Sequence, residues 1–489
     1  MLTLTVFVPA IGAILLLALV RGDRVVRGFA FLVGLVDLLL SAVVFLSFDR
    51  GEGAARFQLI DRLDWITAET FNASYLLGVD GLSAPMVLLT GLLGFCAIIA
   101  SWSIKERVRE YFIWLLLLQT AVMGVFASLD FLLFFLFWEL ELLPMYMLIA
   151  SWGTGRKTYS AMKFLIFTIL GSAFLLVGIV AIFLSQSTGS FDMMILLEQG
   201  SMLSASSAAV PLSLMFWLFF AAFAVKLPTW PVHTWLPDAH TDAPTAASVM
   251  LAGVMLKMGG YGLLRVNVGM FPGEVRTFAW ALILLGVISV LYGAVVTLRQ
   301  TDLKRLIANS SVSHMGLVLV GIGSVGAAAG QVTGSGLNGA ALQLFTHGTI
   351  TALLFVGVGL IYDKAHTRYI PDLGGLASRM PIAAAALAIA GFASLGLPGL
   401  SGFVSEILVF FGAFRAFPLQ TLLSVLGIIL AAGYILWMLE RSLFGPSRER
   451  FATITDASPL EAIPLALLVV SIVLVGVYPA ILTDVFDNA

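Results

Sequence analysis

Apolar runs long enough to cross a bilayer recur along almost the whole sequence. A helix of about 20 apolar residues spans the hydrocarbon core of a membrane, and the chain holds roughly fourteen such runs between Ile14 and Val470. Only 11% of the residues are charged, whereas a soluble domain carries about 25%. The sequence therefore predicts an all-α polytopic membrane protein with about 14 transmembrane helices. The run at residues 2–20 has no basic segment before it, which predicts a first membrane helix and not a cleaved signal.

Lysine and arginine are distributed unequally between the two sides of these predicted helices. The loops after odd-numbered helices hold most of them, and the loops on the other side hold only Arg50, Arg56, Arg62, Arg265, Arg276 and Arg415. Because cytoplasmic loops carry the excess of positive charge, we expect the odd loops in the cytoplasm and both termini on the extracytoplasmic side. Two connections, residues 48–79 and 185–209, are long and polar. We expect the first to form a small structured cover on the extracytoplasmic face.

The stretch from Phe216 to Arg265 is interrupted in a way that ordinary membrane helices are not. Lys226 lies near the end of one apolar run, the chain then passes Pro228 and Pro231, and Lys257 lies inside the next apolar run. A charge inside a membrane span costs several kcal/mol, so such residues usually face the protein interior and mark ion pathways. A helix broken by proline is tolerated at membrane depth where protein or water covers the freed backbone groups. The sequence thus predicts a broken seventh helix in a pathway that moves charge.

A second interruption, Gly396–Gly402, lies in the twelfth predicted helix, with Glu406 directly after it. Paired interruptions at corresponding positions indicate inverted repeats in transporters. We therefore expect two inverted five-helix repeats, helices 4–8 and 9–13, with broken helices 7 and 12. In this register Glu139 corresponds to His314, and Lys226 to Glu406. The expected divisions are residues 1–109 for helices 1–3 and the polar connection, 110–268 and 277–443 for the repeats, and 459–481 for helix 14.

Two glutamates lie in the fifth predicted helix. Glu139 is well inside the apolar sequence FFLFWELELLPMY, which favours a function over a side chain that reaches the membrane surface. Glu141 is two residues further on, about 200° round the helix, so the two carboxylates cannot share a face. For Glu141, which is closer to Pro144, a functional role and a helix-end position both remain open.

Further ionisable residues lie in separate apolar runs. A nearby carboxylate can switch a buried lysine between protonation states, and chains of histidine and carboxylate groups are recurrent proton relays in membranes. One histidine on an apolar face is often only a hydrogen-bonded core residue, but the set as a whole indicates a relay. The candidate proton-transfer residues are Glu139, Lys226, Lys257, His314, His347 and Glu406. Lys163, near a helix start, is expected to extend its amine towards the membrane surface.

Other chemical motifs are weak. The sequence GIGSVG at Gly321–Gly326 fits a dinucleotide fingerprint, but it ends an apolar run and no strand precedes it. No standard zinc spacing matches the cluster His233, Asp238, His240 and Asp242, which a polar turn between helices explains better. Cys96 is the only cysteine, and there is no haem or iron–sulfur signature. We therefore expect no metal, no cofactor and no redox centre in this chain, and no nucleic-acid binding.

Four long segments carry a family resemblance. They are FFLFWELELLPMYMLIASWG, KLPTWPVHTWLPDAHTDAPTAASVMLAGVMLKMGGYGLLR, TDLKRLIANSSVSHMGLVLVG and FTHGTITALLFVGVGLIYDKAHTR. They strongly resemble the antiporter-like subunits of respiratory complex I, and the similarity extends from about Leu77 to Ala432. The glutamate at position 406, after GLPGLSGF, makes the chain resemble the subunit M branch (chain 4) of that family. The related subunits L and N usually have a lysine at this position.

The resemblance implies a fold and a function. It implies fourteen transmembrane helices with two inverted repeats, and proton-transfer roles for Glu139, Lys226, Lys257, His314, His347 and Glu406. It implies a proton-translocating subunit of an NADH:quinone oxidoreductase in the bacterial inner membrane, beside subunits L and N and lipid. NADH, FMN, iron–sulfur clusters and quinone would then be bound by partner subunits. Within this interpretation Glu139 and Lys226 form a close pair, and protons pass through Lys257 and the histidines to Glu406.

Two other functions remain open at this stage. The chain could belong to a multisubunit sodium–proton antiporter, which shares this fold and most of these motifs. It could also be a scaffold that joins neighbouring subunits and transports nothing. A scaffold would tolerate neutral substitutes for Glu139, Lys226 and Glu406, whereas a proton carrier would not.

Overall fold

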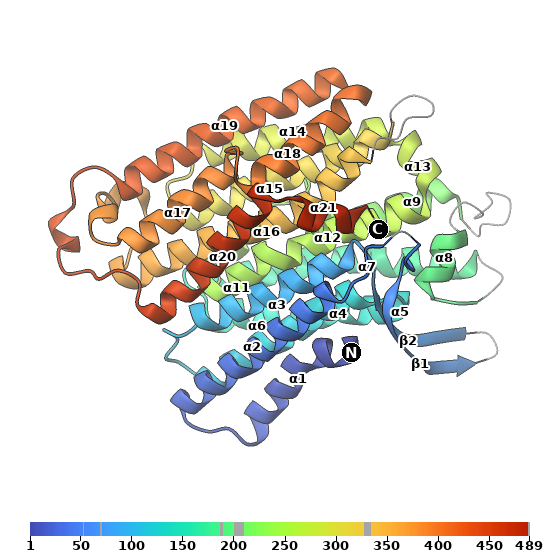
Figure 1. The fold of residues 1–489 in the computed structure, drawn as a ribbon, viewed down its shortest axis with the longest axis horizontal. Coiled ribbons are helices and arrows are strands. Elements are labelled where there is room, and N and C mark those ends of the chain that lie inside the picture. The colour runs from blue at the N-terminus through green and yellow to red at the C-terminus, as the bar shows by residue number, and fades with distance from the viewer. Residues whose placement is uncertain (52, 69–70, 186–188, 200–209, 327–333, 488–489) are drawn as a thin grey trace.

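The structure is a computed structural model, and it describes residues 1–51, 53–68, 71–185, 189–199, 210–326 and 334–487. Long helices lie side by side in one bundle, with α1 (Leu2–Ala18) and α2 (Asp23–Leu46) along one edge and α19 (Pro418–Leu443) along the other (Figure 1). The N-terminal helices and the small sheet are α1 (Leu2–Ala18), α2 (Asp23–Leu46), β1 (Gln58–Ala68), β2 (Phe71–Val79) and α3 (Ser83–Ala100).

The middle of the chain contributes ten helices and two π-helical segments. Its elements are α4 (Val108–Ala127), α5 (Phe131–Leu140), α6 (Leu142–Trp152), α7 (Lys157–Leu184), α8 (Met193–Gln199), α9 (Leu212–Lys226), α10 (Trp235–Asp242), α11 (Thr245–Met250), η1 (Leu251–Met255), α12 (Leu256–Gly262), η2 (Leu263–Val268) and α13 (Pro272–Thr277). Elements α11 to η2 follow each other without a gap and form one membrane-length helix, Thr245–Val268.

The last part begins with α14 (Ala279–Thr297), α15 (Leu303–Gly323), η3 (Ser324–Gly326) and α16 (Ser335–Ala365). It continues through two short 3-10 turns, η4 (Ile370–Asp372) and η5 (Leu376–Ser378), to α17 (Pro381–Ser394), α18 (Ser401–Ala416) and α19 (Pro418–Leu443). The turn η6 (Glu449–Phe451) precedes α20 (Pro459–Val477) and α21 (Ala480–Phe486).

The described residues confirm the predicted all-α membrane fold. Eleven of their helices are long and apolar enough to cross a membrane, and three shorter apolar helices, α1, α9 and α17, lie where the first, seventh and twelfth spans are expected. The exact number of crossings stays a prediction, as do the four predicted divisions of the chain. The apolar parts of Thr245–Val268, Leu303–Gly326 and Ser335–Ala365 are completely buried, so these three helices form the centre of the bundle.

Both predicted interruptions are present. Helix α9 ends at Lys226 and α10 begins at Trp235, with Pro228 and Pro231 between them. Helix α17 ends at Ser394 and α18 begins at Ser401. In the second break Gly396 has a φ of +75°, a left-handed conformation that favours glycine. A Cβ on Gly396 would lie 2.4 Å from Oε2 of Glu406, so the break also makes room for that carboxylate.

One end of the bundle carries the antiparallel hairpin of β1 and β2, together with α8 and α13, and we call this end the hairpin face (Figure 1). The hairpin confirms that residues 48–79 contain an ordered segment, whereas its extracytoplasmic position stays a prediction. It is the main departure from an all-helical chain. The N-terminal ammonium lies 3.1 Å from Asp61 in β1. Burial would raise the pKa of Asp61, but hydrogen bonds from Thr3 and the N-terminus lower it below its ordinary value. Part of the second polar connection, residues 186–188 and 200–209, lies outside the described residues.

Candidate functional site

Lys226, the last residue of α9, makes a buried ion pair at the seventh-helix break. Its Nζ contacts Oε1 of Glu141, and the exposed fractions of the two side chains are 3% and 0%. The break positions this lysine because α9 stops there and its amine is directed at the turn between α5 and α6, where Glu141 lies. Trp138 covers the pair, with Lys226 Nζ 4.4 Å from the ring centroid. Both side chains of the pair are therefore shielded from solvent by the protein.

The direct ion-pair partner of Lys226 is Glu141, whereas the sequence predicted a close pair with Glu139. Helix α5 ends at Leu140 and α6 begins at Leu142, so Glu141 occupies the turn and points inward. Glu139 lies one residue before the end of α5 and is partly exposed, which agrees with the predicted separation of the two carboxylates onto different faces. Its charge acts on Lys226 through space without direct contact. A role for Glu139 in proton transfer stays a prediction.

Lys257 lies in α12, inside the membrane-length helix Thr245–Val268, and is completely buried. Its Nζ donates a hydrogen bond to the carbonyl of Ala252 inside the π segment η1 and lies 2.7 Å from Nδ1 of His347 in α16. Single π turns inside α-helices are often found at functional sites. Helix α12 also touches the seventh-helix break, since a Cβ on Gly259 would lie 2.5 Å from the backbone nitrogen of Leu227. The two lysines are thus carried by elements in direct contact.

The histidines continue this line into the second half of the chain. The rings of His347 and His314 have centroids 5.6 Å apart. His314 Nδ1 lies 3.6 Å from Oε1 of Glu406, and its Nε2 lies 3.1 Å from the hydroxyl of Ser394, next to the second break. Lys257, His347, His314 and Glu406 therefore form a row of buried ionisable groups across α12, α16, α15 and α18.

Small cavities surround the end of that row. Two cavities of about 10 Å³ each lie against Glu406, one lined also by His347 and Ser394 and the other by Ser313 and Ser424. A cavity of roughly this size holds about one water molecule when polar partners are present. The site thus provides both side chains and room for single waters, which is what short proton transfers need.

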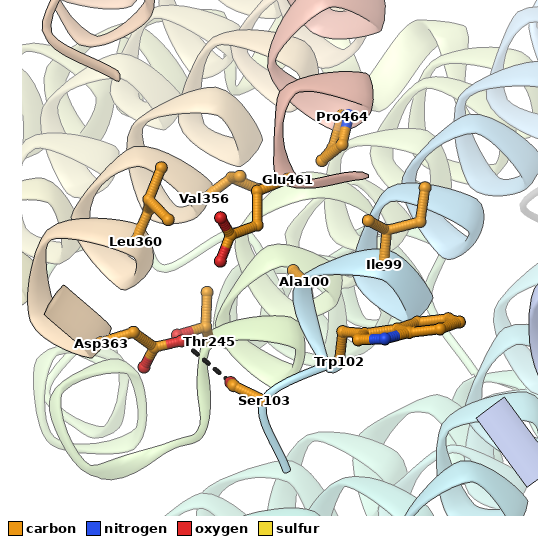
Figure 2. Close-up of a pocket in the computed structure, with 10 residues that line it drawn as sticks. All are labelled: Ile99, Ala100, Trp102, Ser103, Thr245, Val356, Leu360, Asp363, Glu461 and Pro464. Carbon is orange, nitrogen blue, oxygen red and sulfur yellow. Dashed lines mark hydrogen bonds between the residues drawn. The ribbon is translucent and has the colours of Figure 1, made fainter. Parts of the chain in front are cut away.

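Another cavity, of about 40 Å³, lies between the end of α3, the last turns of α16 and the start of α20 (Figure 2). Its polar groups are Asp363 at the end of α16, Glu461 at the start of α20, Ser103 and Thr245. Ser103 donates a hydrogen bond of 2.9 Å to Asp363. Thr245 and Asp363 belong to the same helices as Lys257 and His347, so this cavity lies at the ends of the two helices that carry the central row.

The polar turn after the seventh-helix break contains two residues, Asp238 and His240, whose contacts were not predicted from the sequence. Asp238 pairs with Lys163 at 2.7 Å and with Arg305 at 3.5 Å. Lys163 therefore has a carboxylate partner, where the sequence predicted an amine extended to the membrane surface. His240 is completely buried and stacks on Phe355 with ring centroids 4.7 Å apart, and neither ring nitrogen has a hydrogen-bond partner in the described structure. In the sequence His240 was marked only by its place in the polar turn between the seventh and eighth predicted helices.

Within the described residues there is no group of three or more histidine, cysteine, aspartate or glutamate side chains that could hold a metal ion.

The fold and the site define a class of protein, namely membrane ion-transport subunits with two broken helices and a central row of buried lysine, histidine and glutamate. A family model described as NADH:quinone oxidoreductase/Mrp antiporter, TM, matches residues 128–431. NADH-quinone oxidoreductase subunit M of Rhodobacter capsulatus is 40% identical over 99% of this chain and 94% of its own length. The chloroplastic NAD(P)H-quinone oxidoreductase chain 4 of Mesostigma viride is also 40% identical, over 94% of this chain and 90% of its own length.

Solved structures show the same fold. A chain of respiratory complex I from Thermus thermophilus matches with a TM-score of 0.86 and 27% identity, covering 100% of this chain and 99% of that one. A chain of the Mrp complex from Dietzia sp. DQ12-45-1b matches with a TM-score of 0.85 at 22% identity, a likeness of fold alone. The chain belongs to the NADH:quinone oxidoreductase/Mrp antiporter membrane family, and its relatives of about 40% identity are subunit M and chain 4 proteins, as the sequence resemblance predicted.

Proposed function

We propose that this chain is the proton-translocating subunit M of an NADH-quinone oxidoreductase. NADH oxidation and quinone reduction take place on partner subunits, which bind NADH, FMN, iron–sulfur clusters and quinone, and this chain uses the released energy to move protons outward. The observation that carries the proposal is the buried row of Lys257, His347, His314 and Glu406, with consecutive members 2.7 Å, 5.6 Å between ring centroids, and 3.6 Å apart. Ionisable residues in membrane spans of this kind mark proton pathways.

Proton transfer along the row begins at the ion pair of Glu141 and Lys226. A buried ammonium is stabilised by its carboxylate partner, so moving that carboxylate away makes Lys226 release its proton. Two unit charges 4 Å apart interact by about 4 kcal/mol at an effective dielectric constant of about 20. Moving one charge against 100 mV costs about 2.3 kcal/mol. The interaction energy lost when one ion pair breaks is therefore large enough to drive one proton against this potential.

The rest of the row passes the proton on. Lys226 transfers the proton to Lys257 across the contact between the break and α12. The two histidines then transfer it to Glu406. From Glu406 the proton leaves on the hairpin face, which is the extracytoplasmic side and carries both termini. The protein lies in the inner membrane, with subunits L and N and lipid around it. The two breaks divide the pathway, so no continuous pore is needed.

Sodium–proton antiport is the competing function, because the Mrp chain has the same fold. The purified whole complex in sealed vesicles distinguishes the two. We expect acidification only when NADH and quinone are both present, with the same rate in sodium and in potassium medium, because the input is the redox-driven pair Glu141–Lys226. A trapped pH dye records the rate.

An imposed sodium gradient serves as the control in the same vesicles. A pH change driven by sodium without NADH would contradict the proposal and establish antiport. Equal NADH-driven pumping in variants that are neutral at Lys226 and Glu406 would instead identify a scaffold.

A further inference from the structure

The seventh-helix break changes the backbone hydrogen bonds at the end of α9. In a regular helix the carbonyl of Ala224 accepts from the N–H four residues later, but Pro228 at that position has no N–H. The N–H of Thr229 takes its place and donates to Ala224 at 3.0 Å. The carbonyl of Val225, which a regular helix would pair with Thr229, thus loses its helical partner. This carbonyl belongs to the residue directly before Lys226.

A tryptophan from the far side of the break supplies the missing donor. Trp235, the first residue of α10, donates its indole N–H to the carbonyl of Val225 at 3.0 Å. Both residues are buried, and a buried carbonyl without a partner is unfavourable. The N–H of Trp230 donates to the hydroxyl of Ser289 in α14 at 3.0 Å. Side chains therefore replace helical hydrogen bonds at the break, as broken membrane helices require.

The short helix α10, which carries Trp235, is attached to α7 at both of its ends. At its start Trp235 packs against Phe164 of α7, with ring centroids 5.5 Å apart. At its end the carboxylate of Asp242 accepts from the hydroxyl of Ser160 at 2.6 Å. Ser160 and Phe164 are four residues apart, so they lie on one face of α7. The position of α10 is therefore set by α7.

We propose that Trp235 is a positioning residue for Lys226. Its indole fixes the end of α9 to α10, and so keeps the amine of Lys226 beside the carboxylate of Glu141. Because α10 is attached to α7, a displacement of α7 reaches Lys226 through this hydrogen bond. The inference rests on the proposed function, since the position of Lys226 matters for pumping only if Lys226 carries protons.

A hydrogen bond that only stabilises the fold is the alternative explanation. The variant Trp235→Phe removes the indole N–H and keeps an aromatic ring against Phe164. The matched control is Trp152→Phe, because the indole of Trp152 also donates to a backbone carbonyl, that of Glu106, at 2.7 Å. Trp152 is the last residue of α6, at the end of that helix away from Glu141.

The first measurement is backbone hydrogen–deuterium exchange in the whole purified complex. We expect exchange in residues 223–234 to be roughly fivefold faster in Trp235→Phe, because losing one neutral hydrogen bond changes a local opening equilibrium by about that factor. The Trp152→Phe control should leave this segment unchanged. Exchange at the wild-type rate in Trp235→Phe would mean that the indole does not hold the end of α9, and would overturn the proposal.

The second measurement is the pH dependence of the proton-to-NADH ratio in vesicles that hold the whole complex. A lysine displaced from its carboxylate binds its proton less tightly, so the ratio in Trp235→Phe should decline at a lower pH than in the wild type. A fivefold change in proton binding corresponds to a shift of about 0.7 pH units. A loss of stability alone does not shift this profile, and Trp152→Phe should keep the wild-type profile. An unshifted profile in Trp235→Phe would overturn the positioning role.

An isosteric replacement covers the case in which Trp235→Phe does not assemble. Benzothienylalanine at position 235 keeps the shape of tryptophan but has sulfur in place of the N–H, and it is measured by the same two criteria. The proposed function is tested separately by Lys226→Ala. A normal proton-to-NADH ratio in Lys226→Ala would overturn that function, whereas the exchange measurement would still decide whether Trp235 holds α9.

Discussion

Replacing Lys226 with alanine is expected to abolish the NADH-driven proton transport that this subunit contributes. The substitution removes the cation that Glu141 holds at the seventh-helix break, and with it the first proton of the buried row. The side chain is 3% exposed, so no bulk water can substitute for it directly. The measurement is the initial rate of acidification in vesicles containing the whole complex, divided by the rate of NADH oxidation in the same sample.

Two further lysine variants separate proton transfer from structure. Lys226→Arg keeps a cation beside Glu141 but cannot release a proton under these conditions, so we expect the same loss as with alanine. Lys163→Ala removes another partly buried lysine, paired with Asp238 and outside the row, and should pump as wild type does. Full pumping in Lys226→Arg would show that the lysine only needs to be charged, and would exclude it as a proton donor.

Glu141→Gln is expected to lower NADH-driven pumping more than Glu139→Gln does. Removing one partner of a buried ion pair costs about 3–5 kcal/mol, which corresponds to far more than tenfold in an equilibrium. Glu139 makes no direct contact with Lys226 and is partly exposed, so its loss changes the energy of Lys226 less. The ratio of protons moved to NADH oxidised, measured for both variants in matched vesicles, compares them directly.

The two glutamates are a matched pair, because both substitutions are isosteric and lie two residues apart. Thermal stability of each purified complex is the control for assembly. If Glu139→Gln stops pumping while Glu141→Gln leaves it unchanged, the pairing seen in the structure is not the one that drives the proton.

The helical architecture could be predicted well from the sequence because it depends on local patterns. Apolar runs of membrane length predicted the spans, and the prolines after Lys226 and the glycines before Glu406 predicted both breaks. The polar connection after the second helix also predicted an ordered cover, although not that it is a β-hairpin. Each of these features is encoded in residues that are close together in the chain.

The pairing of side chains could not be predicted in the same way. Whether Glu139 or Glu141 faces Lys226 depends on where α5 ends. Because the chain turns at Glu141, the glutamate that points into the protein is Glu141 and not Glu139, two residues earlier. Hydropathy cannot locate such a turn inside a continuous apolar run. The sequence therefore predicted that the two carboxylates lie on different faces, but not that Glu141 makes the direct ion pair with the lysine.

Contacts between segments that are far apart in the chain could not be predicted from the sequence either. Asp80 and Arg265, which form a buried ion pair, are 185 residues apart and belong to a loop and a helix end whose proximity only the packing determines. His240 was interpreted as part of a polar turn, because the sequence does not show that Phe355 covers it. By contrast, the row of Lys257, His347, His314 and Glu406 was predicted as a set, since a charge in an apolar run is visible without knowing its neighbours.

The central claim is that Lys226 and Glu406 belong to one pathway in series, and a double-mutant comparison of the proton-to-NADH ratio tests it most directly. The variants are Lys226→Ala, Glu406→Gln and the combination of both, each in the whole complex. Residues that act as a unit are strongly non-additive. We predict the same reduced ratio in all three variants. A double variant whose loss equals the product of two smaller, independent losses would contradict a single series pathway.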